Sequence, residues 1–166
     1  MSDFVHLHLH SQFSLLDGAN RLDDVIKAAG EAGMPAVALT DHGNMFGAIE
    51  VYNKARAAGI KPIVGMEAYV AQGSRLDRTP GRGSSNHLVL LAKDETGYRN
   101  LLKLTSSAFL EGFYYKPRVD KELLRQHSEG LICLSACLKG EINEHIVASR
   151  EKEAEAAAKE FLEIFG

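Results

Sequence analysis

Short apolar runs alternate with amphipathic stretches along most of this chain. Runs of a few apolar residues are typical of strands, and apolar residues spaced three and four apart are typical of half-buried helices. The pattern predicts five strands, at residues 4–9, 36–40, 63–70, 87–92 and 131–134. It predicts helices at residues 21–32, 45–58, 96–110, 121–127 and from about 149 onward. Asn20 is expected to cap the first of these helices.

This order of elements is typical of an α/β fold, in which parallel strands are joined by right-handed crossovers. The segment 72–85 interrupts the alternation and is rich in glycine and hydroxyl residues, which predicts a surface loop. Arg75, Arg78 and Arg82 make that loop basic, and the pattern leaves open whether they are solvated or contact phosphate. The alternation also predicts a further strand after Gly166, so we expect this chain to be part of a longer domain.

Composition narrows the class of protein. A length of 166 residues suits one domain that buries about two-thirds of its surface. With 45% hydrophobic and 25% charged residues, the chain is not intrinsically disordered. A net charge of −3 excludes a basic surface that holds duplex DNA by charge alone. No apolar run approaches the ~20 residues of a membrane span, and no secretory signal is evident, so a reduced, cytoplasmic protein is expected.

Three histidines near the N-terminus are the first candidate chemistry. His6, His8 and His10 alternate with apolar residues, so on a strand they would share one face. Crowded imidazoles favour the neutral form, whose free lone pairs suit a metal such as Zn²⁺ or Mn²⁺. A single histidine would more often be structural, whereas three in alternation favour a metal site.

Other candidates lie where strands are expected to end. Asp41 and His42 directly follow the strand at 36–40, and ligand groups in α/β folds gather at such strand ends. Asp41 either binds a metal itself or supports a ligand or a helix N-terminus. Glu67 lies inside an apolar strand, which is unfavourable unless the carboxylate is paired or binds metal. It is therefore either half of a core ion pair or a carboxylate that bridges two metals.

Three further residues have weaker individual signals. His87 opens a predicted strand and alone would be interpreted as a solvated histidine at a loop end. Cys137 follows the last predicted strand, where a thiolate ligand and an ordinary buried thiol are both reasonable, whereas Cys133 fits the buried thiol. Asp17 is either a turn residue or a ligand.

Together these residues form a set of nitrogen, oxygen and sulfur donors that is too large for one tetrahedral site. The candidate metal ligands are His8, His10, Asp17, His42, Glu67, His87 and Cys137. Such a set predicts two or three metal ions, and multinuclear sites hydrolyse phosphate esters. No catalytic residue separate from these ligands is expected.

The motifs around these residues resemble the PHP (polymerase and histidinol phosphatase) superfamily. The segments that carry the resemblance are residues 7–11, 39–44 and 135–137 together with Glu67 and His87. Residues 13–18, 59–65, 91–94 and 96–98 are similar, more specifically, to the N-terminal PHP domain of bacterial DNA polymerase III alpha subunits.

The resemblance implies a distorted (β/α)7 barrel with up to three metals, present here only in part, as its first five or so β/α units. Residues 1–166 would then be the N-terminal portion of a single PHP domain. The family's last motif, which supplies an aspartate and a histidine, does not occur before Gly166, and neither do the catalytic carboxylates of a polymerase palm.

The resemblance also implies how the ligands are shared. His8, His10 and Glu67 would hold one metal. Glu67, His87 and Cys137 would hold a second. Asp17 and His42 would contribute to a third. His6 stands where many members have an aspartate and is expected to orient a ligand, as Asp41 is. Zn²⁺, Mn²⁺ and Fe²⁺ all accept these donors.

Three functions follow as hypotheses. The first is a metal-dependent 3′→5′ exonuclease or phosphoesterase module that acts on the primer end within a replicative DNA polymerase. The second is a non-catalytic module that docks a proofreading exonuclease and the remaining polymerase domains, with metals stabilising its fold. The third, less consistent with the flanking segments, is a small-molecule phosphatase of histidinol-phosphatase type.

Overall fold

The computed structural model of the protein describes residues 4–79 and 84–166, so Arg82 of the basic loop lies outside the described residues. The strands are β1 (Ala36–Leu39), β2 (Lys61–Ala71), β3 (Ser85–Ala92), β4 (Arg118–Val119) and β5 (Leu131–Leu134). The helices are α1 (Leu22–Glu31), α2 (Ala48–Ala57), α3 (Glu95–Leu110), α4 (Lys121–Gln126), α5 (Glu141–Val147) and α6 (Glu151–Phe165). The α/β class predicted from the sequence is confirmed.

The strands form one mixed sheet in the order β1-β2-β3-β5, with the short β4 paired to β2. β2 is parallel to β1 and β4, but β3 is antiparallel to both β2 and β5. The expectation of parallel pairing is therefore wrong for β3. The described residues between β2 and β3 contain no helix, and antiparallel neighbours, unlike parallel ones, need no crossover helix.

The N-terminal segment runs beside β1 but does not form the predicted regular strand. His6 makes a single parallel bridge to Val37, and the Leu9 carbonyl accepts from the Thr40 backbone N–H at 2.9 Å. The Leu9 N–H donates to the Thr40 hydroxyl instead of a backbone carbonyl, at 2.9 Å. A side chain thus replaces a ladder bond, and the histidine segment is held as an irregular chain.

The predicted cap of the first helix is also wrong. The N-cap residue of α1 is Arg21, and no side chain caps the helix. The Asn20 side chain instead donates to the His10 carbonyl at 2.9 Å. The asparagine therefore ties the histidine segment to the start of α1 rather than ending the helix itself.

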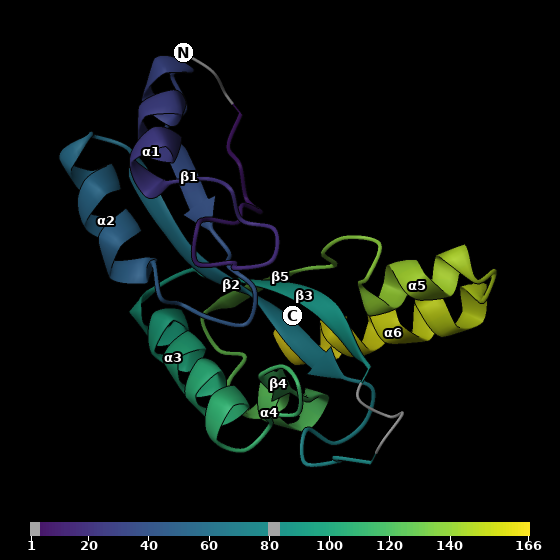
Figure 1. Ribbon diagram of the computed structural model, residues 1–166. Helices are drawn as coiled ribbons and strands as arrows, with labels where there is room; N and C mark the ends of the chain where they lie inside the picture. The colour runs from purple at the N-terminus through teal and green to yellow at the C-terminus, as the bar shows by residue number, and fades with distance from the viewer. Residues whose placement is uncertain (1–3, 80–83) are drawn as a thin grey trace.

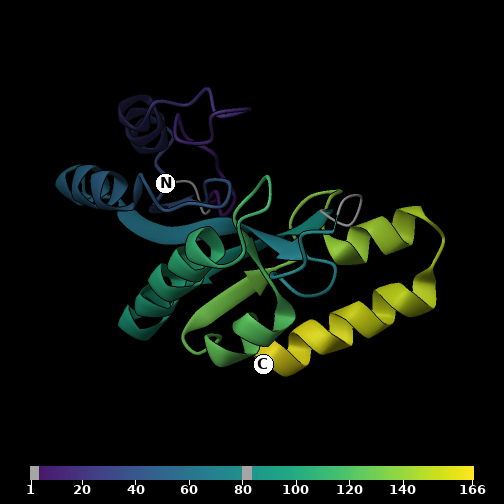
Figure 2. The ribbon, with the colours of Figure 1, turned by 60° about the horizontal axis from the view of Figure 1, so that its bottom comes forward.

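Two groups of helices cover different parts of the sheet, as Figures 1 and 2 show. α1 and α2 pack against β1 around a core that includes Leu22, Val37 and Val51. α3, α4 and α6 pack around a larger core that includes Met66 and Leu90. In the part of the chain that the structure describes, no helix has the length and apolar character that a membrane span needs. The long strand β2 contributes to the larger core and also carries Glu67, which positions the site described next.

Candidate metal centre

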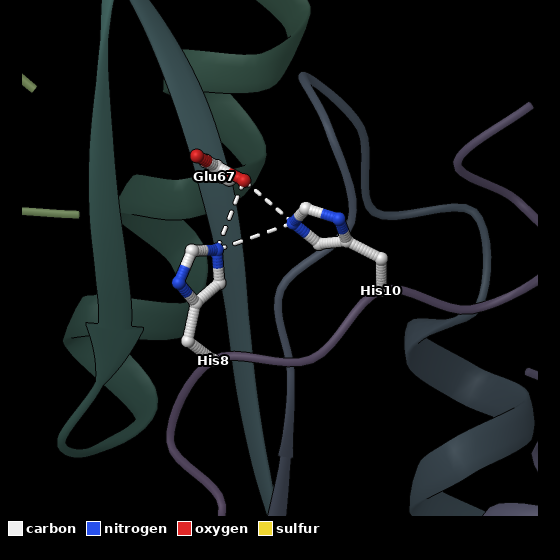
Figure 3. Close-up of side chains that lie close together, drawn as sticks. All are labelled: His8, His10 and Glu67. Atoms are coloured by element: carbon white, nitrogen blue, oxygen red, sulfur yellow. Dashed lines mark hydrogen bonds and ion pairs between the residues drawn. The ribbon is translucent and has the colours of Figure 1, made fainter. Parts of the chain in front are cut away.

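The carboxylate of Glu67 lies at the centre of the candidate site. It is fully buried, at 0% exposure, on β2. Its Oε2 atom is 2.9 Å from His8 Nε2 and 2.5 Å from His10 Nε2. The two imidazole nitrogens are themselves only 3.2 Å apart, so three donor atoms converge on one point, as Figure 3 shows.

A second group of donors adjoins the first through His10. Asp17 Oδ2 is 3.0 Å from His10 Nδ1 and also 3.0 Å from His42 Nε2. His42 Nδ1 in turn lies 3.3 Å from Glu67 Oε2. Asp17 is about half exposed, whereas both histidine side chains are largely covered. The loop that carries Asp17 therefore closes one side of the cluster.

The remaining two candidates approach the other carboxylate oxygen. His87 Nδ1 is 2.7 Å from Glu67 Oε1, and Cys137 Sγ is 3.9 Å from the same atom. Cys137 Sγ also lies 3.6 Å from His87 Nδ1. The structure thus brings together all seven side chains that the sequence singled out. Four histidines and Cys137 thus lie around the two oxygens of one carboxylate, and the sharing of Glu67 between two metals stays a prediction.

Asp41 holds the loop rather than joining the cluster. Its carboxylate, 1% exposed, accepts from the Ser11 N–H at 2.7 Å, the Ser11 hydroxyl at 2.8 Å and the Ser14 hydroxyl at 2.7 Å. These bonds fix the turn between His10 and Asp17. Of the two roles left open for Asp41, the geometry favours the supporting one.

Backbone pairing extends the sheet into the site. The Glu67 N–H donates to the Asp41 carbonyl at 3.0 Å, and the Gly43 N–H donates to the Glu67 carbonyl at 2.8 Å. His42 consequently forms a parallel β-bridge with Glu67 between neighbouring segments of the chain. Gly43 has a φ of 62°, and a Cβ there would lie 2.8 Å from Pro117 Cγ, so glycine is required at this turn.

The contacts that the structure gives His6 are with Phe4 and β1 and not with the candidate ligands. Its ring packs edge-on against Phe4, with centroids 4.8 Å apart, and its carbonyl accepts from the Ala38 N–H. A role in orienting a ligand stays a prediction for His6.

In the basic loop, Arg75 is paired with Asp120 at 3.1 Å and Glu111 at 2.7 Å, which favours a structural role for that arginine.

Sequence reasoning missed Tyr69 as part of the site. Its ring stacks on His42 with centroids 5.6 Å apart and meets His87 edge-on at 5.3 Å. Burial, reinforced by the negative charges of Glu67 and Asp17, raises the pKa of Tyr69 to about 12, so the phenol stays neutral. Two-residue spacing from Glu67 on the same strand was the available signal, since it places both side chains on one face.

The electrostatics keep the carboxylates ionised. Burial alone would raise the pKa of Glu67, but hydrogen bonds from His10, His8 and His87 hold it well below the usual range. Burial would likewise raise the pKa of Asp17, and hydrogen bonds from His42 and His10 lower it on balance. Ionised carboxylates are the form that binds metal.

The pKa values of His10 and His42 shift in opposite directions. The hydrogen bond to Glu67 is the main cause that raises the pKa of His10, whereas desolvation lowers the pKa of His42. In the metal-free protein, the His10 ring is thus favoured as a cation and the His42 ring as a neutral imidazole.

The donor set fits a divalent cation. His42 Nδ1 is buried, faces Glu67 and has no hydrogen-bond partner. His10 faces a carboxylate with each ring nitrogen, which without a metal requires both nitrogens to be protonated. Two ligands about 2.1 Å from one tetrahedral ion lie about 3.4 Å apart, close to the 3.2 Å between the His8 and His10 nitrogens. Three groups of residues could hold an ion, His8–His10–Glu67, His10–Asp17–His42 and His42–Glu67–His87.

Comparisons with known proteins identify the family of the chain. The family described as PHP domain matches residues 6–166. DNA polymerase III subunit alpha of Thermus aquaticus is 57% identical over 168 residues, which cover 98% of this chain and 14% of that protein. The subunit of the same name from Aquifex aeolicus is 52% identical over an alignment of 171 residues, which covers 99% of this chain and 15% of that protein. An amidohydrolase structure from Chromobacterium violaceum aligns with a TM-score of 0.45 and 30% identity over 63% of this chain and 32% of that one. The chain therefore spans only a small part of the curated relatives it matches.

Proposed function

Because the chain belongs to the PHP domain family, we propose that it is the N-terminal part of a metal-dependent phosphoesterase module in a bacterial DNA polymerase III alpha subunit. The observation that carries the proposal is the convergence of imidazole, carboxylate and thiol donors on Glu67. The sequence identity with polymerase alpha subunits from two bacteria supports the proposal that the parent protein is such a subunit. The proposed substrate is the 3′-terminal phosphodiester of a primer strand, removed in the 3′→5′ direction.

Each residue has a defined part in this proposal. His8, His10 and Glu67 would hold one cation, Glu67, His87 and Cys137 a second, and Asp17 with His42 part of a third. Divalent Zn, Mn or Fe in such a site supplies Lewis acidity to a phosphoryl group. Asp41 keeps the turn between His10 and Asp17 in place through three hydrogen bonds, so that these ligands stay aligned.

The test is hydrolysis of a primed DNA by the full-length polymerase chain that contains this segment, loaded with Mn²⁺ or Zn²⁺. We expect release of 3′-terminal mononucleotides that Glu67→Gln abolishes and that a chelator suppresses. Glu50→Gln, a partly exposed residue of α2 that is paired with Lys54, is the control and should leave the rate unchanged. A rate that persists in Glu67→Gln would assign the activity to another site or protein, and preferential turnover of a phosphomonoester would favour the small-molecule phosphatase.

A specific observation also favours a docking role, alone or beside hydrolysis. Phe46, Phe109 and Phe113 are exposed at 65%, 38% and 48%, and neighbouring rings lie 6.1 and 6.2 Å apart. A contiguous exposed apolar strip of this kind marks interaction surfaces. If the strip docks a proofreading exonuclease or another polymerase domain, Phe109→Ser should weaken that association in pull-down and leave metal content unchanged. Association that is unchanged in Phe109→Ser would remove this role from the strip.

A further inference from the structure

A lysine outside the candidate ligand set is joined to the site through Tyr69. Lys116 Nζ lies 4.3 Å from the centroid of the Tyr69 ring. The same ring stacks on His42 and meets the edge of His87. A single aromatic ring therefore links an ammonium group to two candidate metal ligands.

The loop that carries Lys116 is anchored by the residues on both sides of it. The preceding residue, Tyr115, has a φ of 58°, which creates a tight turn. The following residue, Pro117, leaves no space for a Cβ at Gly43, so the loop packs directly against the turn after His42. The guanidinium of Arg118, itself 1% exposed, donates to three backbone carbonyls and anchors the other end. The backbone at Lys116 is thus anchored next to Tyr69, whose ring contacts the cluster.

Lys116 differs from the other lysine that lies over an aromatic ring. Lys121 Nζ lies 5.1 Å from the centroid of Phe161, and it is paired with Glu141 and Glu160, each at 2.7 Å. Among the residues that the structure describes, no carboxylate is paired with Lys116. Contact with the ring orients the Lys116 side chain, and its three N–H donors stay available for an anion.

We propose that Lys116 binds the phosphate of the substrate and places it against the metal centre. This inference rests on the proposed function and assigns that function a substrate-binding residue. An ammonium is a compact charge that binds phosphate without the planar match that arginine needs. The charge also offsets the repulsion between an incoming phosphate and the half-exposed Asp17 carboxylate. The ligand class is a 5′-nucleoside monophosphate unit, either free or at the end of a DNA strand.

The experiment compares Lys116→Met, which keeps the length of the side chain but removes its charge, with Lys116→Arg and with Lys103→Met on the exposed surface of α3. Binding of dTMP to the metal-loaded full-length chain is measured by equilibrium dialysis, and metal content by elemental analysis. We expect Lys116→Met to weaken dTMP binding about tenfold, the effect of losing one charge-assisted hydrogen bond. Lys116→Arg should stay within a few-fold of wild type, and Lys103→Met should have no effect. Metal content should not change in any variant.

Primer hydrolysis separates this inference from the function on which it rests. In Lys116→Met, KM should rise about as much as the dTMP dissociation constant, while kcat changes much less. If wild type does not hydrolyse primers and dTMP binding still depends on Lys116, the proposed function fails and the phosphate-binding role stands. If hydrolysis proceeds while Lys116→Met matches wild type in KM and in dTMP binding, the role of Lys116 is overturned. An equal loss in Lys103→Met would overturn it as well, because the effect would then be one of overall charge.

Discussion

Two neighbouring residues on β2, Met66 and Glu67, are equally buried and yet lie in opposite environments. Met66, 1% exposed, packs into the larger hydrophobic core, and Glu67, 0% exposed, faces the imidazoles. One face of the strand gains stability from apolar burial, which needs no partner of particular chemistry. The other face buries a charge, which is tolerated only while it is paired. The apolar face and the polar face of β2 should therefore respond to different perturbations.

The largest expected effect on folding comes from the apolar face. Met66→Ala should lower the free energy of unfolding by about 2–5 kcal/mol, because it removes a fully buried side chain and leaves a cavity. Urea denaturation of the metal-loaded protein measures the change. Met66→Leu, which conserves volume, should lose less than about 1.5 kcal/mol. Metal content per folded molecule should stay the same, and a parallel loss of metal would show that the faces are not independent.

A change on the polar face should instead lower metal affinity. Glu67→Gln keeps the shape of the side chain but removes the shared charge, so metal affinity should fall at least about 100-fold. Isothermal titration of the metal-free protein with Zn²⁺ or Mn²⁺ measures the affinity. Unchanged affinity in Glu67→Gln would mean that the carboxylate is only a hydrogen-bond acceptor for the histidines.

The two cysteines extend the contrast to chemical reactivity. Burial raises the pKa of Cys133 to about 12, so at pH 8 only about one molecule in 10⁴ has the reactive thiolate there. Cys137 is exposed. In the metal-free protein, iodoacetamide should therefore modify Cys137 and spare Cys133, as peptide mass spectrometry would show. Zn²⁺ should protect Cys137, and modification at an equal rate with and without the metal would remove Cys137 from the ligand set.

The smallest effect lies within the polar face itself. In the metal-free protein the pKa of His10 is raised by its hydrogen bond to Glu67, and the pKa of His42 is lowered by desolvation. NMR titration should place the midpoint of His10 above that of His42. The stability contributed by protonated His10 is fully present below its unfolded pKa and is lost as pH rises through its raised folded pKa. The reverse order of midpoints would contradict the hydrogen-bond pattern around Glu67.

The sequence identified side chains that the fold brings together and the correct fold class, but it did not predict the direction of every strand. His87 and Cys137 had weak signals of their own, and they became candidates because they lie near predicted strand ends and in motifs that resemble the family. The direction of β3 could not be predicted, because it depends on how the segment after β2 returns and not on the periodicity of β3 itself. The irregular path of residues 4–9 was hidden for a similar reason, since the Thr40 hydroxyl that replaces a ladder bond is remote in sequence.

The supporting residues were only partly predictable. Asp41 was identified as a candidate, but the sequence could not distinguish a ligand from a supporting residue, because Ser11 and Ser14 meet it only in the folded chain. Tyr69 has an ordinary strand pattern, and its contact with His42 depends on the pairing of His42 with Glu67. Position on a strand can thus be predicted locally, whereas the role of a polar side chain depends on its spatial partners.

The most direct test of this account is the metal content of the full-length chain, measured by elemental analysis after reconstitution with Zn²⁺, Mn²⁺ or Fe²⁺ and exhaustive dialysis. The account predicts at least one tightly held divalent ion per wild-type molecule and a reduced number when His8 and His10 are both replaced by alanine. Wild-type protein that retains no ion, or a double variant that retains as many as wild type, would contradict the claim that these side chains converge to bind metal.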